Sequence, residues 1–405
     1  MDLHCDFFGW NAEVRDKRMN LSDLTRNAHM LRGSLARKGY MRWWHSFSGV
    51  QSGTGESRTF FIEFFIINPY LYTPRLLNRS MQVPNDQPIL GRYPYYRKRG
   101  LKPSYVMIKA GVFPDSEGNG GKQLHAFYPV SDLLVTSRPM VMQIGNCFYS
   151  EERIAGSVDV STQEARHRCF MTDAGVMEWD LEIYKAVSCH TGFLAHPIAQ
   201  LFNALDSYWH GEGIKSFFRG TVTLDGVAYE VTPETSNGYA DKHWGRKFNL
   251  PLMQFTCGNI TSERTGKPLK HSVLAVSGCC PRFLFLPLRR KLLIQLTYTG
   301  EDFDFGFKPF VLSRCKWETK ATNKRYIWHI IARNKTAVIK ISGSCTKDQM
   351  MQLKYESPDG ILSRSPLLAG AAATGKIRLY RRTSEGKELL DTLHMENGLC
   401  QYREG

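Results

Sequence analysis

The chain has 405 residues, of which 42% are hydrophobic and 12% aromatic, and its formal net charge is +15. This length exceeds one typical hydrophobic core and predicts two domains of roughly 200 residues each. No apolar stretch approaches the ~18 residues that span a bilayer, and the chain has no phosphate loop, dinucleotide fingerprint or nucleophile elbow, which excludes the nucleotide-dependent and α/β-hydrolase classes.

The predicted elements are mostly short strands. Residues 1–6 lack the basic and apolar regions of a secretory signal peptide, and a helical pattern follows at 21–37. Short apolar or alternating runs bounded by Gly, Pro, Asn or Ser then predict strands at 59–67, 105–113, 176–187, 273–278, 292–299 and 375–381 and a hairpin of 326–332 with 336–342. Further helical signals cover 193–205 and 348–353. Many strands and few helices predict an all-β sandwich or barrel.

The ten cysteines are scattered, with no C-x-x-C pair and no histidine spacing that would build a zinc site. We therefore expect reduced thiols, no metal and no other cofactor. A weak internal echo relates Gly39–His45 to Gly238–Gly245, since each precedes an apolar strand. This predicts domains at 1–205 and 206–405, with the apolar stretch 193–205 crossing between them.

The segment Gly238–Gly245, sequence GYADKHWG, places an acid, a base, an imidazole and two large aromatic side chains between two glycines. The glycines would let the backbone turn sharply, and the aromatic side chains would raise the pKa of a neighbouring carboxylic acid. The alternative is an ordinary hairpin corner with solvated charges and one buried tryptophan.

The order of motifs around this segment resembles the tocopherol-cyclase-like family. Asp206–Gly211 (DSYWHG) is followed by a hairpin over 218–230, which turns at Asp225-Gly226, and then by GYADKHWGRKF. The family shows roughly x-Y-x-E-K-[ND]-W-G-x-x-F after the same hairpin. The chain departs from it at Asp241, which replaces a Glu, and at His243, where Asn or Asp is usual. It departs again where the family has W-x-W-x-Q-x-N and this chain has Leu252, Gln254, Thr256 and Gly258.

The resemblance implies two lipocalin-like β domains in tandem, related to carotenoid hydratases and fungal Diels–Alderases, with a ligand chamber near their junction. It also implies a cofactor-free ring closure, in which an acid protonates an alkene of a prenylated phenol and the hydroxyl captures the cation. This chemistry needs one general acid in an apolar pocket, aromatic faces beside the cation and little water. Asp241 is the first candidate acid, with Lys242 or His243 setting its protonation state. A surface ion pair of Asp241 with Lys242 is the alternative.

Glu63 is the second candidate acid, because in a strand it shares a face with Phe61, Phe65 and Ile67. A structural glutamate bonded to an Arg or Tyr is the alternative. His210 is a candidate for orienting the acid or the substrate hydroxyl. The candidate substrate-binding side chains are aromatic except for Lys242, and core packing is their simpler role: Tyr40, Trp43, Trp44, Tyr208, Tyr239, Lys242 and Trp244.

Two functions stay open: a cyclase or isomerase acting on an apolar, polyunsaturated substrate, and a non-catalytic lipocalin-type binder of such a molecule. The positive charge gathers at Arg97–Arg99, Arg289–Lys291 and Arg381–Arg382, yet no nucleic-acid-binding signature accompanies it. We expect no nucleic-acid partner. Peripheral contact with an anionic membrane and a solvated basic surface both remain alternatives. A cytoplasmic location is expected, and the oligomeric state is not predicted.

Overall fold

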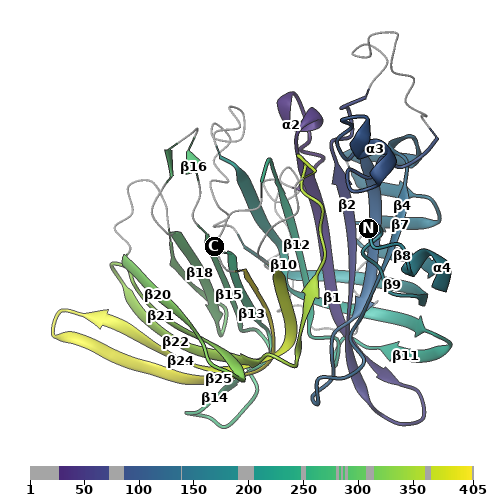
Figure 1. Cartoon of the computed structure of the whole chain (residues 1–405). Coiled ribbons are helices and arrows are strands. Elements are labelled where there is room, and N and C mark those ends of the chain that lie inside the picture. Colours follow the sequence, from purple (N-terminus) through teal and green to yellow (C-terminus); the bar gives the residue numbers. More distant parts are fainter. Residues whose placement is uncertain are drawn as a thin grey trace, which may run out of the picture.

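The computed structural model describes residues 27–72, 86–137, 139–189, 205–247, 252–279, 282–283, 286–287, 291–306, 314–360 and 366–403. Two large antiparallel sheets lie side by side and account for nearly all of this structure (Figure 1). The helices of the described part are single turns at the surface: α2 (Ser34–Arg37), α3 (Pro94–Lys98) and α4 (Thr162–Ala165), with a 3₁₀ turn, η2 (Val130–Asp132). The predicted all-β fold with two β units in tandem is confirmed.

The first sheet has twelve strands, eleven of them in the order β4-β3-β2-β1-β11-β10-β9-β8-β7-β6-β5, and β12 lies off this path. Strands β11 and β12 lie end to end between β1 and β10, because both pair with β1 on one side and with β10 on the other. The sheet curls so that β4 contacts β8. Its strands are β1 (Tyr40–Gln51), β2 (Ser57–Ile67), β3 (Tyr105–Val112), β4 (Lys122–Tyr128), β5 (Leu133–Ser137), β6 (Met140–Ile144), β7 (Cys147–Ser150), β8 (Arg153–Val160), β9 (Gly175–Cys189), β10 (Ser207–Leu224), β11 (Val227–Val231) and β12 (Gly238–Gly245).

The second sheet has eleven strands, nine of them in the order β19-β18-β15-β13-β25-β24-β22-β21-β20, and β14 and β23 pair with β25 and β24. A separate two-stranded ribbon is formed by β16 (Arg282–Phe283) and β17 (Leu286–Pro287). The strands of the sheet are β13 (Leu252–Cys257), β14 (Ile260–Ser262), β15 (Val273–Cys279), β18 (Lys291–Tyr298), β19 (Glu301–Phe305), β20 (Arg314–Ala321), β21 (Arg325–Arg333), β22 (Ala337–Thr346), β23 (Met350–Leu353), β24 (Leu367–Thr383) and β25 (Gly386–Arg403).

Most of the predicted strands are confirmed. Strands β2, β9, β15 and β24 contain the predicted runs, β3 and β18 end one residue before theirs, and β21 pairs with β22 as the expected hairpin. The hairpin of β10 and β11 turns at Asp225-Gly226, and both residues have positive φ (50° and 81°), as a two-residue type I′ turn requires.

Three local predictions are wrong. The segment Gly238–Gly245 is not a hairpin corner with solvated charges, because it forms the fully buried strand β12. The stretch 348–353 contains β23, since pairing with β24 overrides its weak helical signal. The stretch 21–37 is not one helix, because Gly33, with a φ of 57°, precedes the single turn α2. The apolar stretch 193–205 lies outside the described residues except for Leu205.

The chain passes from the first sheet to the second between Gly245 and Leu252. The predicted boundary at 205/206 therefore falls before the last three strands of the first sheet. Those strands belong there because β12 pairs with β1 over seven residues, from Tyr40↔Gly245 to Ser46↔Tyr239. The division into two separate domains stays a prediction.

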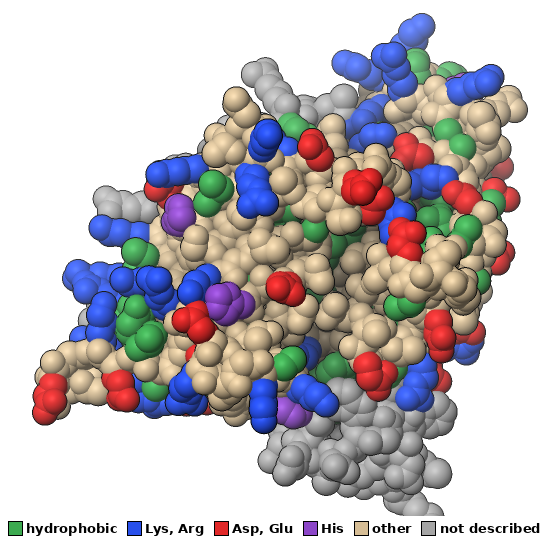
Figure 2. All heavy atoms as spheres, turned by 90° about the horizontal axis from the view of Figure 1, so that it is seen from below, with side chains coloured by type: hydrophobic (Ala, Val, Ile, Leu, Met, Phe, Trp, Pro, Cys, Tyr) green, Lys and Arg blue, Asp and Glu red, His purple; other side chains and the backbone are tan. Residues whose placement is uncertain are grey.

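Lysine and arginine side chains occur in several groups with acidic side chains among them on the face shown in Figure 2. Parts of the predicted basic clusters are engaged within the protein: Arg381 pairs with Glu301 at 2.8 Å, and Arg382 donates to the backbone oxygen of Asn334 at 3.0 Å. Arg289 and Arg290 lie outside the described residues. Contact with an anionic membrane stays a prediction.

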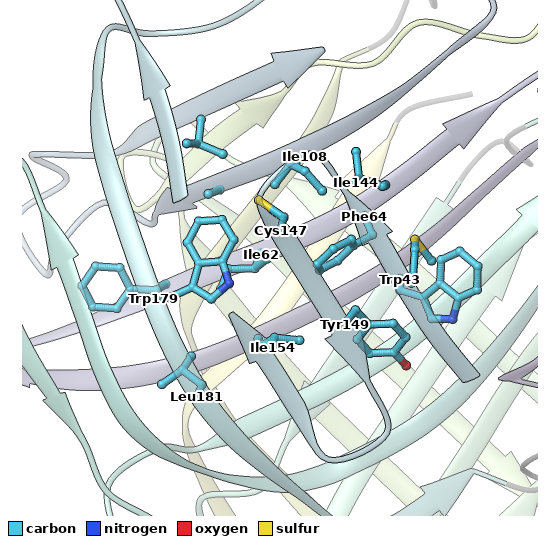
Figure 3. Close-up of a cluster of buried hydrophobic side chains, with 14 of the residues drawn as sticks. Trp43, Ile62, Phe64, Ile108, Ile144, Cys147, Tyr149, Ile154, Trp179 and Leu181 are labelled. Atoms are coloured by element: carbon cyan, nitrogen blue, oxygen red, sulfur yellow. The ribbon is translucent and has the colours of Figure 1, made fainter. Parts of the chain in front are cut away.

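Three large apolar cores and one small cluster lie within the described residues. One fills the curl of the first sheet, where Trp43, Phe64 and Tyr149 point toward one another (Figure 3). Another lies within the second sheet. The third lies between the sheets, because it combines side chains of β1 and β2 such as Trp44 with side chains of β15 and β24. We call this third region the inter-sheet core.

Candidate functional site

The side chains of β12 alternate between two environments, as the pleat of a strand requires. Tyr239 packs in the inter-sheet core, whereas Trp244 packs in the core of the first sheet. Asp241 and His243 share the face of Tyr239, and Lys242 shares the face of Trp244. The predicted interaction of Asp241 with Lys242, as a surface ion pair or as a partner that tunes the acid, is therefore wrong, because the two side chains are buried on opposite faces.

A row of chemically active side chains crosses four adjacent strands toward the inter-sheet core. Lys109 of β3 is opposite Glu63 of β2, Glu63 is opposite Trp44 of β1, and Trp44 is opposite Asp241 of β12. Residues directly opposite each other point to the same face. The two carboxylates thus flank Trp44, on strands separated by about 10 Å. Glu63 is 0% and Asp241 1% exposed, which confirms that they do not both face solvent.

Asp241 is held by buried donors from three strands. Its Oδ2 accepts hydrogen bonds from Trp209 Nε1 at 2.8 Å, from the Tyr239 hydroxyl at 2.7 Å and from Gln254 Nε2 at 2.8 Å. Burial alone would raise the pKa of the carboxyl, but His243, Arg42 and these hydrogen bonds outweigh it and hold the pKa well below its usual range. Asp241 is therefore ionised at neutral pH, which is the opposite of what a proton donor needs. Its Oδ1 has no hydrogen-bond partner among the described residues.

His243 lies beside Asp241, with its Nε2 3.3 Å from the carboxylate Oδ2. Burial and then the nearby guanidinium of Arg42 lower the pKa of His243 below 6.5, against the attraction of Asp241. The ring is therefore neutral at pH 7. The buried Nε2 makes no hydrogen bond among the described residues, so its contact with Asp241 is electrostatic. A neutral imidazole keeps one ring nitrogen as a proton acceptor.

Glu63 anchors the other end of the row. Its Oε2 accepts a hydrogen bond from the Tyr355 hydroxyl at 2.6 Å and lies 3.7 Å from Lys109 Nζ and 3.9 Å from Arg42 Nη1. The lysine ammonium lies 3.2 Å from the centre of the Tyr355 ring, and burial lowers its pKa to about 7 despite the attraction of Glu63. These contacts fit the alternative interpretation of the sequence, in which Glu63 is a structural residue bonded to an Arg or a Tyr. Its other oxygen, Oε1, has no partner among the described residues.

Arg42 connects the two ends of the row. It donates to the Tyr355 hydroxyl at 2.8 Å and contacts the side-chain oxygen of Gln401 at 3.4 Å. Sequence reasoning missed Arg42, Lys109 and Tyr355, and it treated Gln254 only as a departure from a family pattern. The available signal was alternation, because Arg42 and Trp44 share one face of β1 and Lys109 interrupts an apolar strand.

Five of the predicted site residues lie in or toward the core of the first sheet instead. Lys242 donates to the backbone oxygens of Asn27 and Ala28, and its ammonium lies 4.9 Å and 5.1 Å from the rings of Trp43 and Trp244. Tyr208 stacks on Trp244 at 5.3 Å. His210 is opposite Lys242 on the neighbouring strand, so it faces away from Asp241 and cannot orient that acid. The structure therefore separates Trp43, Lys242, Trp244, Tyr208 and His210 from the inter-sheet row.

Aromatic side chains cover the row on the inter-sheet side. Trp44 stacks on Phe61 with ring centres 4.8 Å apart, and Tyr40 stacks on Phe65 at 6.3 Å. A small cavity of about 10 Å³, enough for the centre of one water molecule, lies over Trp44 and between the sheets. It is lined by Trp44, Phe113, Tyr239, Gln254, Thr256, Gly370, Leu399, Cys400 and Gln401. Gln254, whose side-chain oxygen has no hydrogen-bond partner among the described residues, is one of the lining residues, whereas Glu63, Asp241 and His243 are not.

Within the described residues, no group of three or more His, Cys, Asp or Glu side chains is arranged to hold a metal ion. None of the described helices has the length and apolar character needed to cross a membrane.

No protein-family model matches the chain, and a search of curated proteins finds no match. Among solved structures, the chain is similar to an AttH candidate from Nitrosomonas europaea, with 10% identity, 88% of this chain and 92% of that chain covered, and a TM-score of 0.41. It is also similar to kievitone hydratase from Nectria haematococca, with 11% identity, coverage of 96% and 94%, and a TM-score of 0.43. Likenesses of this size leave the activity of the chain open.

Proposed function

We propose that this protein holds an apolar, unsaturated small molecule between its two sheets and acts on it without a cofactor, by acid–base chemistry of the cyclase or isomerase type. The observation that carries the proposal is the buried row in which Glu63 and Asp241 flank Trp44, with His243 3.3 Å from Asp241.

Burial of these charges destabilises the folded state, because each buried ion loses several kcal/mol of hydration free energy. The row nevertheless places two carboxylates in the core, and one oxygen of each has no partner among the described residues. Titratable groups with strongly shifted pKa values, gathered beside an aromatic-lined cavity, are typical of active sites. The resemblance to the tocopherol-cyclase-like family points to the same reaction class.

The ionised state of Asp241 changes the role we assign to it. In our proposal Asp241 orients His243, and the neutral imidazole takes the proton from the substrate hydroxyl. The hydroxyl oxygen then bonds to one carbon of an alkene that is conjugated with a carbonyl, the carbonyl takes the displaced electron pair as an enolate, and the imidazolium returns the proton to the other alkene carbon. The product is an isomer of the substrate, so no oxidant, reductant or cofactor is consumed. Glu63 is the alternative proton donor for a reaction that begins by protonating the alkene.

The second candidate function is a non-catalytic binder of an apolar molecule. The saturation of Asp241 Oδ2 by three donors favours it, because a carboxylate clamped in this way also serves simply to join β12, β10 and β13. In that case the aromatic side chains bind the ligand and no product forms.

The test begins with purified protein incubated with a cellular lipid extract, followed by mass spectrometry of the retained compounds and chromatography for a new isomer of unchanged mass. An enzyme retains a compound and converts it, and both Asp241→Asn and His243→Gln lower turnover by about 10² to 10⁴ while binding persists. The matched control Asp180→Asn, which changes an exposed carboxylate, leaves turnover intact. Retention without conversion, abolished by Trp44→Ala, indicates the binder. Full turnover in both Asp241→Asn and His243→Gln contradicts the proposed roles of these residues and leaves Glu63 as the candidate proton donor.

A further inference from the structure

A second, larger cavity of about 390 Å³ opens between the two sheets, away from the first. It is lined by the loop after α4, by the segment that follows β23 and by the adjoining ends of β24 and β25. The lining residues with charged or titratable side chains are Arg92, His167, Arg168, Lys354, Tyr355 and Arg403, and no Asp or Glu is among the lining residues. We call this space the basic cavity.

The positive side chains of the basic cavity are poorly compensated within the described structure. No carboxylate of the described residues forms an ion pair with Arg92, Arg168 or Lys354. Arg92 donates to the backbone oxygen of Tyr355 at 2.9 Å, while its buried Nε has no hydrogen-bond partner there. Glu356 attracts Arg92 without reaching it as an ion pair. Cations gathered with so little counter-charge repel one another, so a bound anion would lower the free energy of the folded state.

The cavity is concave, half open and mixed in chemistry, which distinguishes it from the solvated basic surface. Leu353, Met171 and Leu367 supply apolar area beside the cations. Arginine and lysine are the side chains that recognise carboxylates and phosphates. An anion with a small apolar body satisfies both parts of the lining.

We propose that the basic cavity is a binding site for a small organic anion, a carboxylate or a phosphate monoester. The site is distinct from the cavity over Trp44, although Tyr355 lines the basic cavity and also donates to Glu63 of the buried row. The proposal stands whether or not the row is catalytic.

The experiment measures binding of phenyl phosphate and of benzoate to the full chain by isothermal titration calorimetry. The test variant is Arg168→Gln/Lys354→Gln, because these two side chains line the cavity and neither forms an ion pair among the described residues. The control is Lys316→Gln/Arg378→Gln, which removes the same charge from exposed positions on β20 and β24. We expect at least one anion to bind, with about tenfold weaker binding in the test variant and less than about twofold change in the control.

A second arm separates a soluble anion from a lipid headgroup. Sedimentation with vesicles of phosphatidylcholine, with and without phosphatidylserine, measures membrane attachment, and phenyl phosphate is added as competitor. Binding of a soluble anion that the test variant weakens supports the site, whether or not vesicles also bind. The proposal is overturned if neither soluble anion binds, if both double variants lose affinity equally, or if only anionic vesicles bind.

Discussion

Replacing Asp241 by Asn tests the electrostatic account of the inter-sheet row most directly. The change keeps the size and shape of the side chain. It replaces one of two acceptor oxygens by an NH₂ group and removes the negative charge that faces Arg42 and His243.

The magnitude follows from the three buried donors. Trp209, Tyr239 and Gln254 are each 3% exposed, and all of them donate to one carboxylate oxygen. Asn can still offer one carbonyl oxygen to all three donors, but each charge-assisted hydrogen bond becomes a neutral one and loses about 1 kcal/mol. We therefore expect Asp241→Asn to lower the free energy of unfolding by about 3 kcal/mol, within the ~3–5 kcal/mol typical of breaking a buried ion pair.

The dependence on pH gives an independent signature. The pKa of Asp241 is lowered in the folded state, so its stabilising contribution is complete above the unfolded value of about 3.9 and is lost as the pH falls through the folded pKa. The stability difference between the wild type and Asp241→Asn should stay constant between about pH 5 and 7 and shrink below about pH 4.

Urea unfolding followed by tryptophan fluorescence measures both quantities. The matched control is Asp180→Asn, because Asp180 pairs with Arg153 at 2.8 Å with both side chains more than half exposed. That variant should lose less than about 1 kcal/mol. Equal losses in the two variants, or an Asp241→Asn loss below about 0.5 kcal/mol, would refute the picture of a carboxylate clamped by buried donors.

Three further substitutions test other parts of the structure. Glu212→Gln should cost about 1–3 kcal/mol in urea unfolding, because the buried ammonium of Lys185, 2.9 Å away, loses this charge partner but keeps Glu151 at 2.7 Å; a loss under about 0.5 kcal/mol would contradict this. Burial lowers the pKa of Lys109 to about 7, so the folded state binds fewer protons between pH 7 and about 10.4. The urea midpoint of the wild type should therefore rise relative to that of Lys109→Met from pH 7 to 9.5, and parallel curves would exclude the shift. Gly238→Ala should destabilise by about 1–3 kcal/mol, since the added Cβ would lie 2.4 Å from a backbone oxygen, whereas Gly343→Ala, with no contact under 3.5 Å, should be close to neutral.

The sequence determined the class of fold and the faces of its strands. Alternation of apolar and polar residues predicts a strand with one buried face, and a continuous apolar run predicts a strand with two buried faces. The structure has strands where these patterns predict them, as in β2, β3, β9 and β18, because burial of the apolar faces stabilises the strand. The same reasoning correctly placed Glu63 on the face of Phe61 and Phe65, within the inter-sheet core. It also identified Asp241, His243 and Trp44 as residues of interest, although not as neighbours in one row.

Only the tertiary structure decided which faces meet. The order of residues in β12 does not reveal that Lys242 faces the core of the first sheet while Asp241 faces the inter-sheet core. That depends on the pairing of β12 with β1, about two hundred residues earlier in the chain. Tyr355 reaches Glu63 across 292 positions of sequence, and Gln254 approaches Asp241 from the other sheet. Strand register and sheet packing are set by the summed burial of many side chains, so no single motif encodes them. The ionised state of Asp241 is likewise a property of donors that the fold, rather than the motif, brings to it.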